Sequence, residues 1–294
     1  MRLPRLLVPA LLALAGCTSE SPPAVSTQAE CLRDPGCTRL MVAAHRGDHT
    51  ELPENSLAAI RRAAEVGAEL VEVDTRHTAD EAVVLVHNSS VDGTTDGAGE
   101  VSELTLAEIR ALTLSRADPD DPETQQVPLF TEALALAREL GVMLYVDQKS
   151  ERWDLVLAEI QEGAFFEQAV VRDASRSVLA QMKAGEPRLL VMPAISSGAS
   201  IEPTLLDLPD VTIVEISHDR PWPALAEALQ AAGLKVQQDV LGEADDLAAS
   251  GDYSAWQEYV DSGVVLLQTD LPRLLAAAVR EFNQTGVFPT SGPG

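Results

Sequence analysis

Cysteine is scarce in this chain, with only three in 294 residues. Cys31 and Cys37 form a close pair around the turn sequence at 34–36, and no further cysteine is available to complete a zinc site. Outside the cytosol, such a pair is typical of a small disulfide loop. We therefore predict a Cys31–Cys37 disulfide in an exported protein.

Basic residues are also few. The chain has 21 Lys and Arg against 46 Asp and Glu, which gives a formal charge of −25. This balance argues against a nucleic-acid partner and against simple electrostatic adsorption to anionic lipid. It indicates a solvated acidic surface.

The N-terminal apolar run at 6–15 is too short to span a bilayer permanently, and it follows Arg2 and Arg5. Leu14-Ala15-Gly16-Cys17 resembles a bacterial lipoprotein box, in which the cysteine becomes the lipidated N-terminus. We therefore predict a signal peptide over 1–16, lipid on Cys17 and a membrane-anchored protein of the bacterial cell envelope, on its periplasmic or extracellular face. An ordinary secretory signal is the alternative.

Residues 19–30 are rich in Ser, Pro, Thr and Ala and predict a flexible tether. The predicted organisation is a lipid-anchored tether with its disulfide loop over 17–38, a catalytic domain over 39–287 and a flexible tail over 288–294. The oligomeric state is left open.

Strand-like and helical segments alternate through the catalytic domain, whose length is near the ~250 residues of an eight-fold β/α barrel. Strands are predicted at 41–45, 70–74, 82–87, 142–147, 168–172, 188–193, 211–216, 234–238 and 264–268, and helices at 54–66, 129–140, 152–162, 175–184, 223–232 and 270–282. One strand is in excess, and the irregular one is 82–87, which no helix precedes. We predict an α/β fold, a distorted TIM (β/α)8 barrel. The alternative is an open doubly wound sheet, but no G-x-G-x-x-G follows the first strand.

An insertion at 88–128 interrupts the alternation after the strand that ends at His87. It contains a loop rich in Ser, Gly, Thr and Asp, a short helix expected over 102–112, and an acidic loop. On the catalytic face of a barrel, such a segment is a candidate lid or substrate wall, and a filler loop is equally consistent with it.

Polar residues that carry chemistry stand at the ends of the first strands. His45 and Arg46 follow the strand at 41–45, and Glu72 and Asp74 lie at i and i+2, so both project from one face. Two buried acids side by side repel each other unless a cation lies between them, which favours a hard metal such as Ca²⁺ or Mg²⁺.

The short turn at 78–81 predicts a hairpin, because it leaves no room for a helical crossover. If the turn is centred between Asp80 and Glu81, Asp74 faces His87. The strand at 142–147 places Asp147 and Lys149 on one face at its C-terminal end. Asp147 would be a third carboxylate ligand for the metal, and Lys149 a cationic side chain that contacts phosphate oxygens. The alternative for Asp147 is an N-cap of the helix at 152.

Together these motifs resemble the glycerophosphodiester phosphodiesterase family. They are His45-Arg46-Gly47, Pro53-Glu54-Asn55-Ser56, Glu72-x-Asp74, the strand ending at His87, Thr94-Thr95 before Gly97-x-Gly99, and Gln268-Thr269-Asp270-Leu271-Pro272. The resemblance implies a distorted TIM barrel, one divalent metal, and cleavage of a glycerophosphodiester to glycerol 3-phosphate and an alcohol.

The roles that the resemblance implies fall on the following residues: catalysis on His45 and His87, metal binding on Glu72, Asp74 and Asp147, phosphate binding on Arg46 and Lys149, and site support on Glu54 and Asn55. The implied mechanism is general acid/base catalysis by the two histidines.

Several positions depart from the family pattern. Asn88 replaces the usual Asp after the second histidine, and Asp147 replaces Glu. A late strand that usually carries a Trp-Thr pair reads Val236-Gln237-Gln238-Asp239, and the strand at 168–172 ends in Arg172-Asp173 where Ser-Phe is usual. These changes leave the head-group preference open. They also leave two other functions to consider: phospholipase D-like cleavage of lysophospholipid or sphingomyelin-type substrates, and a decayed, lipid-anchored binding module.

Overall fold

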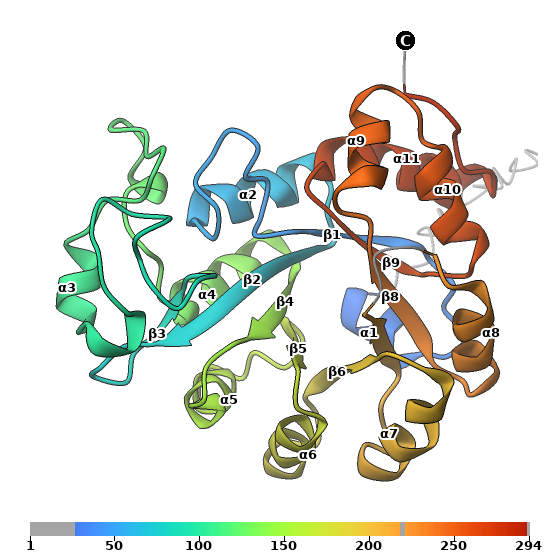
Figure 1. The fold of residues 1–294 in the computed structure, drawn as a ribbon, viewed down its shortest axis with the longest axis horizontal. Coiled ribbons are helices and arrows are strands. Elements are labelled where there is room, and N and C mark those ends of the chain that lie inside the picture. Colours follow the sequence, from blue (N-terminus) through green and yellow to red (C-terminus); the bar gives the residue numbers. More distant parts are fainter. Residues whose placement is uncertain (1–26, 218–220, 293–294) are drawn as a thin grey trace, which may run out of the picture.

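Eight parallel strands close into a barrel in the computed structural model, which describes residues 27–217 and 221–292 (Figure 1). The barrel strands are β1 (Met41–Ala44), β2 (Leu70–His77), β4 (Met143–Gln148), β5 (Ala169–Asp173), β6 (Leu190–Ile195), β7 (Ile213–Ile216), β8 (Lys235–Asp239) and β9 (Leu266–Thr269). Since β1 pairs in parallel with both β2 and β9, no edge is left open between them. The predicted TIM barrel is confirmed, and the open sheet is wrong.

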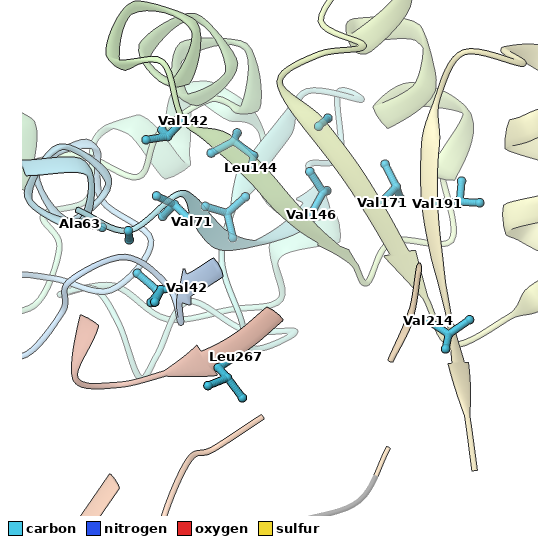
Figure 2. Close-up of a cluster of buried hydrophobic side chains, with 14 of the residues drawn as sticks. Val42, Ala63, Val71, Val142, Leu144, Val146, Val171, Val191, Val214 and Leu267 are labelled. Atoms are coloured by element: carbon cyan, nitrogen blue, oxygen red, sulfur yellow. The ribbon is translucent and has the colours of Figure 1, made fainter. Parts of the chain in front are cut away.

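Side chains alternate between the barrel interior and the surrounding helices. Val42, Val71, Leu144 and Val171 face outward, and Figure 2 shows them in the buried layer between strands and helices. The helices of this layer are α2 (Leu57–Val66), α4 (Phe130–Leu140), α5 (Trp153–Glu162), α6 (Arg176–Gly185), α7 (Ile201–Asp207), α8 (Pro223–Ala231), α9 (Glu243–Ala249), α10 (Ser254–Asp261) and α11 (Pro272–Thr285). Within the described part of the chain, no helix combines the length and apolar character needed to cross a membrane.

A short helix closes the end of the barrel at which the strands begin. Helix α1 (Gln28–Arg33) buries Ala29, Cys31 and Leu32 against inward-facing residues at the strand starts, namely Met41, Leu70, Met143, Leu190, Ile213 and Leu266. A disulfide joins Cys31 to Cys37, as predicted. Residues 27–38 are therefore part of the folded domain, in contrast to the tether expected over 17–38. The signal peptide and Cys17 lie outside the described residues.

Strand β3 (Val83–Leu85) pairs antiparallel with β2 alone and is the irregular ninth strand. Thr75 pairs with Leu85 and His77 with Val83, so Asp74 is level with Val86, and the predicted Asp74–His87 pairing is wrong by one residue. The cause is the turn. Thr78 N–H donates to the carbonyl of Ala82, and Glu81 has φ 66°, so three residues centred on Asp80 form the loop.

The insertion and the tail both pack against the domain. The insertion holds η1 (Val101–Glu103), α3 (Leu106–Arg110) and η2 (Pro122–Thr124) around a small apolar cluster. Helix α3 begins after a capping box of Thr105 and Glu108, so it is shorter than predicted. The tail expected to be flexible over 288–294 is ordered to residue 292: Phe288 is buried, and Tyr253 N–H donates to the carbonyl of Thr290.

The packing of α1 generates a prediction about stability. Leu32→Ala removes a fully buried side chain, and we expect it to lower the free energy of unfolding by about 2–5 kcal/mol in urea titrations. Leu206→Ala is the matched control, because Leu206 on α7 is 75% exposed. Equal, small losses in the two variants would mean that α1 is not part of the cooperative unit.

Candidate active site

Three carboxylates converge at the end of the barrel where the strands finish. Asp74 on β2 is paired with Asp147 on β4, and Glu72 lies one inward position below Asp74. Glu72 and Asp74 are 2% and 1% exposed, and one oxygen from each of the three carboxylates lies within 4.8 Å of the others. The predicted metal-ligand trio is therefore assembled in one place. Asp147 does not cap α5, whose N-cap position is occupied by Arg152.

The three carboxylates repel one another in a buried site, so positive charge beside them would stabilise their ionised forms. Burial, and then the charges of Asp74 and Asp147, raise the pKa of Glu72 well above its ordinary value. Lys149 Nζ lies 2.7 Å from Asp147 Oδ2 and 3.2 Å from Asp74 Oδ1. Burial lowers the pKa of Lys149, but the charges of Asp147 and Asp74 outweigh it and raise the pKa overall. Three convergent carboxylates are the donor set that a hard divalent cation prefers, so the residues fit such an ion.

The loop between β1 and α2 orients the acids. Asn55 Nδ2 donates to Asp74 Oδ2 at 2.8 Å, and its Oδ1 accepts from the backbone N–H of Asp74 at 3.0 Å. The backbone N–H of Arg46 donates to Glu72 Oε2 at 2.8 Å. The guanidinium of Arg46 pairs with Glu54 at 3.0 Å and lies 3.5 Å from Asp74 Oδ2. The two support residues thus have different partners. Asn55 orients Asp74, a predicted metal ligand, and Glu54 orients Arg46, the predicted phosphate-binding residue.

His45 is held by a carboxylate that the residue-by-residue reasoning did not single out. Its Nδ1 lies 2.7 Å from Asp270 Oδ1. A carboxylate only accepts, so Nδ1 carries the proton and Nε2 is the nitrogen left for chemistry. The hydrogen bond from His45 outweighs burial and lowers the pKa of Asp270. Asp245 holds Asp270 in turn, accepting its backbone N–H at 2.7 Å.

His49, a residue of the loop after β1, packs edge-on against His45 with 5.8 Å between ring centroids. Its Nδ1 donates to the carbonyl of His45 at 2.8 Å, and its Nε2 lies 3.5 Å from Asp270 Oδ1. His49 therefore supports the same histidine–carboxylate pair. The signal available in the sequence was its position, four residues after His45.

His87 follows β3 and is half-buried. Its Nδ1 donates to Asn88 Oδ1 at 3.0 Å, so Asn88 makes the hydrogen bond that an aspartate would make, without the charge. The carbonyl of His87 accepts two hydrogen bonds from the guanidinium of Arg76, at 3.0 and 2.8 Å. These contacts fix the backbone and the ring tautomer of His87.

Arg172 on β5 links the acid trio to the far side of the barrel. Its Nη1 lies 3.2 Å from Asp147 Oδ1, and its Nε lies 2.7 Å from Glu215 Oε2 on β7. Burial lowers the pKa of Arg172, but the pairing with Glu215 outweighs it and raises the pKa. Sequence reasoning noted Arg172 only as a departure from the family pattern and did not single out Glu215. The available signal for Glu215 was its position two residues after Ile213, on the inward-facing side of β7 and near the end of the strand.

Comparisons with known proteins show which family and which proteins the chain resembles. Residues 45–251 match the glycerophosphoryl diester phosphodiesterase family. The chain is 26% identical to a glycerophosphodiester phosphodiesterase of Caldanaerobacter subterraneus subsp. tengcongensis, over 83% of this chain and 99% of that protein. It is 41% identical to the bovine glycerophosphodiester phosphodiesterase 1 over 118 residues, which cover 39% of this chain and 35% of the bovine protein.

Solved structures share the fold. A phosphodiesterase of Oleispira antarctica, determined in complex with the product sn-glycerol-3-phosphate, superposes with a TM-score of 0.67 at 22% identity. The match covers 82% of this chain and 96% of that one.

The sharp turn after His45 generates a prediction. Gly47 has φ +80°, and a Cβ there would lie 2.7 Å from the backbone of Ala59. We expect Gly47→Ala to lower the free energy of unfolding and to displace Arg46. Gly141→Ala is the matched control, since Gly141 has φ +72° with open space around it and incurs only the conformational cost of about 1 kcal/mol. Thermal or urea unfolding measures both, and equal losses would contradict the steric explanation.

Proposed function

The chain belongs to the glycerophosphoryl diester phosphodiesterase family, and on that premise we propose that it hydrolyses glycerophosphodiesters to glycerol 3-phosphate and an alcohol with the help of one divalent cation. The observation that carries the proposal is the convergence of Glu72, Asp74 and Asp147 beside Arg46 and Lys149. A phosphodiester is anionic and has a poor leaving group, and this cluster supplies both the metal ligands and the cations that such a substrate needs. The relatives that carry the name of this activity, and the product complex of the Oleispira antarctica protein, support the assignment of substrate and product.

The cation, Ca²⁺ or Mg²⁺, would be held by Glu72, Asp74 and Asp147. When bound there, it offsets the charge of the phosphate and polarises the phosphorus–oxygen bonds, an effect worth several kcal/mol of transition-state stabilisation. Lys149 pairs with both Asp74 and Asp147, so its ammonium lies beside the metal acids, where it would meet the oxygens of a phosphate bound there. Arg46 approaches from β1, oriented by Glu54.

The two histidines handle the protons. Nδ1 of His45 carries a proton and donates a hydrogen bond to Asp270, so Nε2 is the atom that exchanges a proton with substrate. Nδ1 of His87 donates a hydrogen bond to Asn88 in the same way, which leaves its Nε2 for proton transfer. One histidine takes the proton of the attacking hydroxyl while the other donates a proton to the leaving oxygen.

Metal removal tests the first part of the proposal. Excess EDTA is expected to abolish release of glycerol 3-phosphate, and Ca²⁺ or Mg²⁺ to restore it, because the acid trio requires a compensating cation. Asp74→Asn is expected to weaken cation binding in calorimetry, whereas the exposed Asp120→Asn leaves it unchanged. Full activity in EDTA would rule out a metal-dependent enzyme.

Histidine substitutions test the second part. His45→Ala and His87→Ala are each expected to lower kcat by at least about 10²-fold, with little change in unfolding temperature, because each removes a proton-transfer group. The control is His77→Ala, since His77 Nδ1 contacts Ser150 Oγ at 2.5 Å and has no part in the mechanism. Near-native turnover in either test variant would assign that histidine a structural role.

We propose further that Cys17 carries lipid and anchors the enzyme in a bacterial cell envelope, on the basis of the Leu14-Ala15-Gly16-Cys17 sequence. One acyl chain binds membranes only marginally, so stable anchoring needs the several chains of a bacterial lipoprotein. Cys17→Ser is expected to move the protein to the soluble fraction without altering the turnover of the purified domain. Retention of this variant in membranes at high salt would identify another anchor.

A further inference from the structure

A second polar cluster faces the barrel interior across from the metal acids. It consists of Glu215 on β7, Gln237 and Asp239 on β8, and Gln268 on β9, and we name it the acceptor wall. In the closed sheet, β7 is four strands away from β2, and β8 is four strands away from β4. Glu215, Gln237 and Asp239 therefore lie on the opposite side of the barrel from Glu72, Asp74 and Asp147, and Gln268 on β9 is two strands away from β2.

Strand register makes the acceptor wall compact. Glu215 is paired with Gln237, and Asp239 with Gln268, so the four side chains form two adjacent levels on neighbouring strands. Glu215, Gln237 and Gln268 are 7%, 0% and 5% exposed, and Asp239 is half-buried. The wall is thus set into the barrel end, with Asp239 as its most accessible member.

Hydrogen-bond acceptors exceed donors on the wall. Gln237 Nε2 donates to Asp239 Oδ1 at 2.8 Å, while Gln237 Oε1 and Gln268 Oε1 receive no hydrogen bond from any described residue. Buried amide oxygens are normally satisfied, so two open acceptors beside two carboxylates indicate a ligand that brings donors.

The acceptor wall also carries a net negative charge, which favours a ligand that is a cation. Glu215 and Asp239 carry two negative charges against the one positive charge of Arg172, which leaves one negative charge in excess. Burial and the charge of Glu215 raise the pKa of Asp239 to about 6. The guanidinium of Arg172 touches both Asp147 and Glu215, so the metal acids and the wall are separated by the span of one small polar group.

We propose that the acceptor wall binds the primary ammonium of an aminoalcohol head group, so that the preferred substrate is a zwitterionic glycerophosphodiester of the ethanolamine type. This inference rests on the proposed function and specifies its substrate class. The phosphate meets Arg46, Lys149 and the cation at the metal acids, and the ammonium meets Glu215 and Asp239. Its three N–H donors match the wall's open oxygens.

The same chemistry disfavours a trimethylammonium head group, which has no N–H and is typically bound by aromatic faces. Of the described aromatic residues, ten belong to or pack against the outer core; the eleventh, Tyr145, is buried in the apolar cluster that α1 caps, and burial together with the charges of Glu215 and Asp239 raises the pKa of its hydroxyl. The wall is therefore built for hydrogen bonds and charge.

The test compares kcat/KM of the metal-loaded protein for three substrates: glycerophosphoethanolamine, glycerophosphocholine and glycerophosphoglycerol. The ethanolamine ester is expected to be preferred by about tenfold or more, the value of one charge-assisted hydrogen bond. Asp239→Asn is expected to remove that preference by raising KM for the ethanolamine ester, with kcat/KM for the glycerol ester held within about twofold. The exposed Glu202→Gln controls for loss of a remote charge.

The outcomes separate this inference from the assignment of the enzyme. Turnover of all three esters at equal efficiency, or preference for the choline or glycerol ester, overturns the ammonium site while leaving the proposed function intact. An equal fall for all three esters in Asp239→Asn would place the wall at the shared glycerophosphate part and also overturn it. Turnover of none of the esters with any divalent cation rejects the proposed function itself. Asp239→Asn is the test variant because it leaves the Arg172–Glu215 pair in place.

Discussion

Repulsion among buried carboxylates is the constraint on which this active site is built. Glu72, Asp74 and Asp147 lie too close together to be ionised without compensation. The backbone N–H of Arg46, the side-chain amide of Asn55 and the ammonium of Lys149 each reduce part of that cost. Because these groups come from three strand ends and one loop, the barrel closure that brings the strands together is also what assembles the site.

Much of the fold followed from periodicity in the sequence. All nine strands were predicted near their observed positions, mainly because the eight parallel strands are buried and most of them are continuous apolar runs. The strand-end rule also located the metal acids and Lys149, since consecutive inward positions share a face. The helices α7, α9 and α10 were not predicted, because seven or eight residues are too few for helical periodicity to be recognised.

The remaining parts of the site depend on contacts between residues distant in sequence. The His45–Asp270 pair joins positions 225 residues apart, and the pair of Arg172 and Glu215 spans 43. Only the closed barrel shows that these strand ends meet. The hairpin register failed for a local reason: a left-handed Glu81 makes the turn one residue different in length from the turn assumed. Similarly, the residues of α1 were assigned to a tether because the segment around them is rich in Ser, Pro, Thr and Ala, although one face of this short helix is apolar and buried.

Helix α1 and the catalytic residues lie at opposite ends of the barrel. The helix covers the end of the barrel where strands start, and the catalytic residues occupy the end where strands finish. The described chain therefore begins on the side remote from the chemistry. If the chain is held at a surface through its N-terminus, as we propose, the opening lies at the end of the domain away from the point of attachment. That arrangement leaves the opening accessible to substrates dissolved in the aqueous phase.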